Sequence, residues 1–165
     1  MEQFTTKFLS AIETAEKNLN RISPDKSATK PAPDKWSAKE ILGHLIDSAF
    51  VNAERFLNTQ NQEHLVFSGY PQDQYVEAQK YQMQDWEQLI QTWKYANLHI
   101  REIVGRISQT VLEKQHHKHN FHKIAFRSVA PEEPATLRFL IEDYYLHMVH
   151  HLNQIFRLRG LETLA

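Results

Sequence analysis

The chain has 165 residues, of which 41% are hydrophobic and 24% are charged, so it can bury one compact core and lacks the composition of a disordered protein. Its 19 basic and 20 acidic residues nearly cancel and form no basic stripe, which argues against a nucleic-acid partner. The absence of cysteine excludes disulfides, thiolate metal ligands and a cysteine nucleophile.

The first predicted helix covers residues 4–22, where apolar side chains recur every three or four positions. The same stretch is acidic and amphipathic, and it lacks the apolar block and small-residue cleavage site of a signal peptide. No stretch is long and apolar enough to cross a bilayer. We therefore expect a cytoplasmic protein without a membrane partner. The three prolines of "SPDKSATKPAPDK" then predict a loop.

The remaining predicted helices have clear boundary signals. Ser37 is a favourable N-cap residue, and Glu40 follows three positions later, which is the pattern of a capping box at the start of the second helix. The third helix has the most regular apolar repeat and covers residues 86–107. The fourth begins at about Thr136, another N-cap candidate, and ends at Gly160.

Four amphipathic helices without a convincing strand pattern predict an all-α fold, a four-helix bundle that forms a single domain over residues 1–165. The two connections at residues 58–82 and 108–133 are too long for simple helical hairpins. They predict crossovers, or loops that cover one end of the bundle.

Three of the ten histidines stand together in the fourth predicted helix, in the segment "HMVHH". On a wheel of about 100° per residue, His151 falls inside the apolar face and His147 at its edge, while His150 falls toward the polar side. Two inward imidazoles one turn apart could share a metal ion. Each could instead hydrogen-bond a neighbour such as Tyr144 or Gln154, and the spacing leaves both interpretations open.

A third metal ligand should come from another helix, and His44 is the best candidate because it lies at the edge of the apolar face of the second predicted helix. Three neutral imidazoles leave open positions for water or substrate, as in catalytic zinc sites. Asp47 could orient the imidazole of His44, and Asp143 could orient that of His147. With Tyr144, these carboxylates are the candidates for acid–base catalysis, although each could be a solvated surface group.

Two other histidine patterns are less informative. The segment "HHKHNFH" at residues 116–122 lies in a predicted loop, where such a tract could bind nickel or zinc weakly. A solvated polar loop is the interpretation that we favour there. The pair His147 and His151 also resembles half of a zincin motif, but Met148 replaces the Glu that serves as general base, which excludes a metalloprotease on these residues.

Two longer segments, "WSAKEILGHLIDS" and "EDYYLHMVHHLNQI", together resemble the DinB-like superfamily, which includes YfiT-type proteins. The resemblance implies a four-helix bundle in which three histidines hold one divalent metal ion. The histidine of the family's "GHL" element falls on His44, and its closing H-x-x-x-H pair falls on His147 and His151. Because the order and separation of these elements also fit, the resemblance covers nearly the whole chain.

The same resemblance implies zinc or nickel as the metal and a homodimer as the assembly. It favours a metal-dependent transferase, in which the metal holds a low-molecular-weight thiol as thiolate and directs it at an electrophile. The first alternative is a metal-dependent hydrolase that cleaves an ester or amide. The second alternative is a non-enzymatic module in which the metal only ties two helices together.

Overall fold

The computed structural model describes residues 1–165 and confirms the all-α four-helix bundle. The long helices are α1 (Glu2–Leu19), α3 (Ala38–Thr59), α5 (Trp86–Gly105) and α8 (Leu137–Leu158). Short helices lie in the connections, namely α2 (Pro24–Ala28), α4 (Gln72–Gln79), η1 (Tyr81–Met83), α6 (Gln109–Glu113) and α7 (Phe121–Ile124). None of the helices combines the length and the apolar character that a bilayer-spanning segment requires.

Single hydrogen bonds confirm the predicted helix boundaries. Ser37 Oγ accepts the backbone N–H of Glu40, and the Glu40 carboxylate accepts the backbone N–H of Ser37 at 2.8 Å, which completes the capping box. Thr136 caps α8 by accepting the backbone N–H of Phe139. After the end of α8, Gly160 adopts a left-handed φ of 64°, which lets the chain turn away from the helix.

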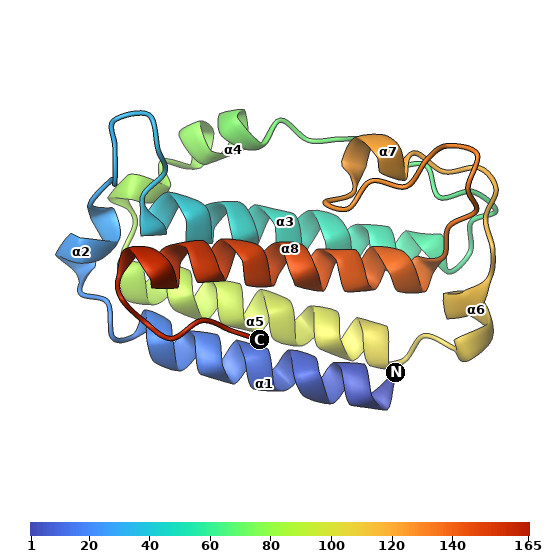
Figure 1. Ribbon diagram of the computed structural model, residues 1–165, viewed down its shortest axis with the longest axis horizontal. Coiled ribbons are helices and arrows are strands. Elements are labelled where there is room, and N and C mark those ends of the chain that lie inside the picture. Colours follow the sequence, from blue (N-terminus) through green and yellow to red (C-terminus); the bar gives the residue numbers. More distant parts are fainter.

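Helices that are neighbours in space are not always neighbours in sequence. α3 packs against α5 and α8, and α1 also packs against α5 and α8. Figure 1 shows that α3 and α5 run in the same direction, so residues 60–85 return along the bundle as a crossover that carries α4 and η1. Residues 106–136 join two helix ends at the same end of the bundle. The predicted long connections therefore include both a crossover and an end cover.

A close contact holds the crossover against α3 next to His44. The ring of Tyr81 lies so near the backbone of Gly43 that a Cβ atom at this position would collide with it. The Tyr81 hydroxyl donates a hydrogen bond to Asp47 Oδ1 at 2.7 Å. This packing fixes η1 on α3 one residue before His44.

The histidine-rich segment 116–122 is only in part the solvated loop that we favoured from the sequence, because His117 and His122 are exposed but His116 and His119 are buried. His116 and His119 are only 4% and 7% exposed. His116 Nδ1 lies 2.9 Å from the carbonyl oxygen of Glu63, and His119 Nε2 lies 2.6 Å from that of Glu133. The first contact fastens this connection to the crossover, and the second closes it on itself. Buried backbone carbonyls need such partners, which explains the two histidines without a metal.

Candidate metal centre

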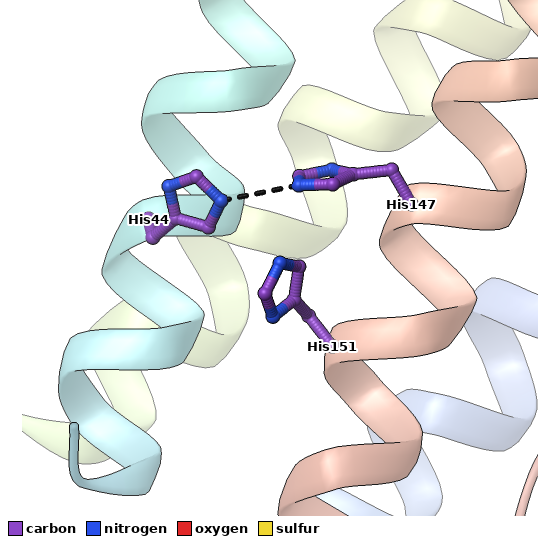
Figure 2. Close-up of side chains that lie close together, drawn as sticks. All are labelled: His44, His147 and His151. Carbon is purple, nitrogen blue, oxygen red and sulfur yellow. Dashed lines mark hydrogen bonds between the residues drawn. The ribbon is translucent and has the colours of Figure 1, made fainter. Parts of the chain in front are cut away.

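Three histidines from two helices converge at one point of the structure. Figure 2 shows His44 on α3 facing His147 and His151 on successive turns of α8. One ring nitrogen of each histidine lies within 4.8 Å of those of the other two. The Nε2 atoms of His44 and His147 are 3.2 Å apart. The three residues proposed as ligands from the sequence are therefore brought together, and this triad could bind a metal ion.

The three imidazoles are uncharged at neutral pH. Burial lowers the pKa of His44 to about 4, and the nearby His151 adds to the effect. Burial also lowers the pKa of His147 to about 3, again reinforced by neighbouring histidines. The pKa of His151 is lowered by burial as well, although its contact with Gln154 opposes this shift. Neutral imidazole is the form that binds metals, so the donor set fits a divalent ion that accepts nitrogen ligands.

Each histidine can bind the metal through one ring nitrogen, so the partner of its other ring nitrogen provides a second test of this fit. His151 Nδ1 lies 3.1 Å from Gln154 Oε1, and an Nδ1–H that donates to this oxygen leaves the Nε2 lone pair free for a metal. His44 is 1% exposed, and its Nδ1 has no partner. Asp47 Oδ2, three positions along the same helix, is also buried without a partner. The other carboxylate oxygen, Oδ1, accepts the hydrogen bond from Tyr81. Because His44 Nδ1 and Asp47 Oδ2 do not bond to each other, an orienting role for Asp47 stays a prediction.

The other two residues that we singled out are engaged outside the triad. The Asp143 carboxylate accepts the backbone N–H groups of Phe126 and Arg127, each at 2.7 Å, and so anchors the segment that follows α7. Tyr144 is buried and donates its hydroxyl to Asn97 Oδ1 at 2.7 Å. A role for Asp143 or Tyr144 in orienting ligands or in catalysis stays a prediction.

A cavity of about 500 Å³ opens beside the triad, and His147 and His151 belong to its lining. α3 and α8 form part of its wall, and residues of α4 and α7 and of the segments next to them supply the rest. In Figure 1, α4 and α7 lie on the same side of the bundle, over α3 and α8. The two long connections thus help to enclose the space that a substrate would enter.

Aromatic rings surround the imidazoles and account for their low exposure. The ring centroid of Trp36 lies 5.3 Å from that of His44, and Tyr70 lies nearly parallel to His44 at 6.4 Å. Phe126 contacts His147 with a centroid distance of 5.7 Å. This apolar surround is the physical cause of the lowered imidazole pKa values, because it disfavours the charged form.

Sequence reasoning missed several residues of the cavity, among them Arg55, Tyr70 and Phe126. A signal for Arg55 was present in the sequence. Arg55 continues a stripe of polar residues on one face of α3, in which successive members are four, four and three positions apart: His44, Ser48, Asn52 and Arg55. Tyr70 and Phe126 lie in the long connections, where no periodicity indicates which side chains turn toward the bundle.

Comparisons with known proteins agree with the fold. The model of the DinB superfamily matches residues 8–155. YfiT from Bacillus subtilis, described as a probable metal-dependent hydrolase with an unusual four-helix bundle topology, shares 15% identity over 98% of this chain and 91% of its own, with a TM-score of 0.73. The DinB-like protein YjoA from the same organism shares 19% identity over 99% of this chain and 96% of its own, with a TM-score of 0.60.

A comparison with curated protein sequences gives no match. The two structural likenesses show a shared fold, and the family match extends from α1 into the last turn of α8. It includes both helices that carry the three histidines. This chain belongs to the DinB superfamily.

Proposed function

We propose that this protein is a metal-dependent hydrolase whose three histidines hold one divalent ion, zinc or nickel, at the wall of a substrate cavity. The observation that carries the proposal is that His147 and His151 belong both to the converging triad and to the cavity lining. Catalytic zinc sites combine three protein ligands with an open position, whereas structural sites are closed by four. The description of YfiT as a probable metal-dependent hydrolase supports the same class of reaction.

The metal ion and the protein chain would contribute different parts of the reaction chemistry. His44, His147 and His151 would hold the divalent ion, which would polarise a carbonyl oxygen and lower the pKa of a water molecule. The chain contributes the neutral imidazoles, which keep their ligating form at neutral pH because they are buried. It also contributes the rings of Trp36 and Phe126, which exclude bulk water from the neighbourhood of His44 and His147.

Tyr70 is the side chain that we assign to transition-state stabilisation. It lines the cavity, and its ring lies nearly parallel to that of His44. Burial raises the pKa of its phenol, while a hydrogen bond with Ser48 opposes this shift. The hydroxyl therefore stays protonated at neutral pH and can donate a hydrogen bond to negative charge that develops on a carbonyl oxygen.

The proposal is tested with untagged protein that has been stripped of metal and reloaded with zinc. Hydrolysis of neutral 4-nitrophenyl esters is expected to require the metal and to be lost in His44→Ala. Tyr70→Phe is expected to lower kcat by about 10²- to 10³-fold without changing the metal content, as for other single oxyanion donors. His150→Ala is the matched control, because His150 is an exposed neighbour outside the triad. Hydrolysis that survives chelation or the loss of His44 would contradict the proposal.

The thiol transfer implied by the family resemblance is tested in the same preparation. Consumption of a low-molecular-weight thiol is measured with a model electrophile, with and without metal. Metal-dependent thiol consumption without ester hydrolysis would replace the hydrolase by a transferase. One bound ion with neither activity would instead indicate a module in which the metal ties α3 to α8. The implied homodimer also stays a prediction, which sedimentation velocity can test.

A further inference from the structure

The cavity contains a buried cation that has no acidic partner in the chain. Arg55 is only 7% exposed, and it takes part in none of the ion pairs of the structure. Its hydrogen bonds go to uncharged oxygens: Nη1 donates to Asn52 Oδ1 at 3.4 Å, and Nη2 donates to the carbonyl of Ser68 at 2.8 Å. A guanidinium remains charged even when it is buried, so this charge must be compensated by other means.

No nearby carboxylate forms an ion pair with Arg55. Asp143 also lines the cavity, but its oxygens already accept the backbone N–H groups of Phe126 and Arg127 and the Nε–H of Arg127. Glu54, the neighbour of Arg55 in sequence, is exposed to solvent and forms no ion pair with it, so its charge acts on the guanidinium only from a distance. Lys123 adds a second positive charge to the lining. The cavity therefore carries an excess of positive charge, and an uncompensated buried charge is costly.

Arg55 also has a structural role, and only part of that role uses its charge. The bond to Ser68 and the position of the guanidinium over the ring of Phe67, 5.6 Å from its centroid, hold this segment of the crossover on α3. An uncharged amide could donate to the same carbonyl oxygen. A guanidinium has five N–H donors, and only two of them are used by these bonds. The other three donors take part in no hydrogen bond of the structure.

The cation and the triad lie at different ends of one helical stripe. Arg55 follows His44 by 11 positions, which places their Cα atoms about 16 Å apart along α3. Side chains on a helix lean toward its N-terminus, and Arg55 Nη1 accordingly donates to Asn52, which lies one turn nearer to His44. Ser48 and Asn52 line the cavity between them. A molecule of moderate length can thus contact both ends.

We propose that Arg55 binds a carboxylate at the end of the substrate that lies opposite the bond to be cleaved. The substrate class is then an ester or amide with a carboxylate several bonds away from the scissile carbonyl. The cleaved bond rests on the proposed function, whereas the carboxylate rests on Arg55 and the charge of the cavity. The planar, singly charged guanidinium matches a carboxylate in both shape and charge.

The test uses isothermal titration calorimetry on the zinc-loaded full-length protein. It compares the binding of a series of dicarboxylates, from malonate to suberate, with the binding of the monocarboxylate hexanoate. A dicarboxylate of intermediate length is expected to bind at least about tenfold more tightly than hexanoate, since each tenfold step corresponds to one well-made charged contact. Arg55→Met is expected to remove this advantage without weakening hexanoate, and Arg55→Lys to keep part of it. Lys17→Gln, an exposed position on α1, controls for the loss of one positive charge.

The comparison on the unaltered protein does not depend on any variant, so it remains valid if Arg55→Met fails to fold. Equal affinity for dicarboxylates and hexanoate there overturns the proposal. The proposal is also overturned if a folded Arg55→Met protein still binds the dicarboxylate more tightly than hexanoate.

Neutral and carboxylate-bearing 4-nitrophenyl esters then separate this inference from the proposed function. If neither ester is hydrolysed but the dicarboxylate advantage depends on Arg55, the hydrolase fails and the anion site stands. If hydrolysis depends on metal but Arg55→Met changes KM equally for both esters, the hydrolase stands and the anion site fails.

Discussion

The Nε2 atoms of His44 and His147 lie 3.2 Å apart, although 103 positions separate the two residues in the chain. Two imidazole nitrogens at this distance are compatible if one donates a proton to the other, or if both lone pairs point at a shared cation. His151 favours the shared cation, because one of its ring nitrogens lies within 4.8 Å of those of both partners. A hydrogen bond between His44 and His147 would not explain why the imidazole of His151 lies so close to both.

Metal content distinguishes these two arrangements. Protein purified without a nickel column is expected to contain about one divalent ion per chain, as a three-ligand site holds a single ion. His44→Ala is expected to weaken metal binding by more than about 100-fold, since even the loss of an outer hydrogen-bond partner costs 10- to 100-fold. Elemental analysis checks this, with His150→Ala as the control at an exposed neighbouring position. Equal metal content in the two variants would favour the hydrogen bond.

Gly43→Ala is expected to destabilise the fold by about 1–3 kcal/mol, the usual cost of forcing extra atoms into a packed contact. The new Cβ would collide with the ring of Tyr81, which is held in place by its hydrogen bond to Asp47. Higher helix propensity offsets about 1 kcal/mol of this loss.

Gly105→Ala is the matched control for that substitution. Gly105 is the last residue of α5, and the atom nearest to its Cβ position is Thr5 Cγ2 at 3.8 Å. The gain in propensity should therefore appear without a clash. Urea unfolding of both variants measures the difference, and equal stabilities would mean that Tyr81 can move away from α3.

Asp143→Asn is expected to loosen the segment after α7 while leaving the metal content unchanged. The carboxylate accepts the backbone N–H groups of Phe126 and Arg127, and an amide can accept with only one of its two atoms. Leaving a backbone N–H without its partner costs about 1–3 kcal/mol. Hydrogen exchange at these two amides should therefore accelerate. Glu142→Gln is the control, and a loss of metal with unchanged exchange would assign Asp143 to the metal centre instead.

The pH dependence of stability tests the environment of Asp47. Burial raises the pKa of its carboxyl above the ordinary 3.8, and the hydrogen bond from Tyr81 opposes this shift. A carboxyl with a raised pKa in the folded state binds its proton more tightly there than in the unfolded state. Its contribution to stability is therefore present below pH 3.8 and is lost as the pH rises through the folded-state pKa.

Asp47→Asn removes this loss of stability at higher pH, and it keeps a side-chain oxygen that can accept the hydrogen bond from the Tyr81 hydroxyl. Relative to the wild type, the metal-free variant is expected to gain stability as the pH rises from about 4 to about 7. Urea unfolding at both pH values measures the gain, and metal-free protein is required because a cation in the triad would compensate the carboxylate. A stability difference that is the same at both pH values would contradict the raised pKa.

The sequence by itself determined the local features of this protein. The capping box of Ser37 and Glu40 and the cap at Thr136 were predicted correctly because each involves residues within four positions of one another. Helix geometry likewise placed His147 and His151 on one face before any fold was known. His44 was the best candidate for their partner because it lies at the edge of an apolar face, and the family resemblance pointed to the same residue, although spacing alone does not say which helix packs against which.

Tertiary structure alone decided the rest. It made α3 and α8 neighbours, buried His116 and His119 against backbone carbonyls, and turned Tyr70 toward the cavity. It also left Arg55 buried without an acidic partner. Periodicity shows that a helix has a buried face, but the partner of that face is chosen by the packing of the whole chain. Loops have no period, so the contacts of their side chains exist only once the bundle has formed.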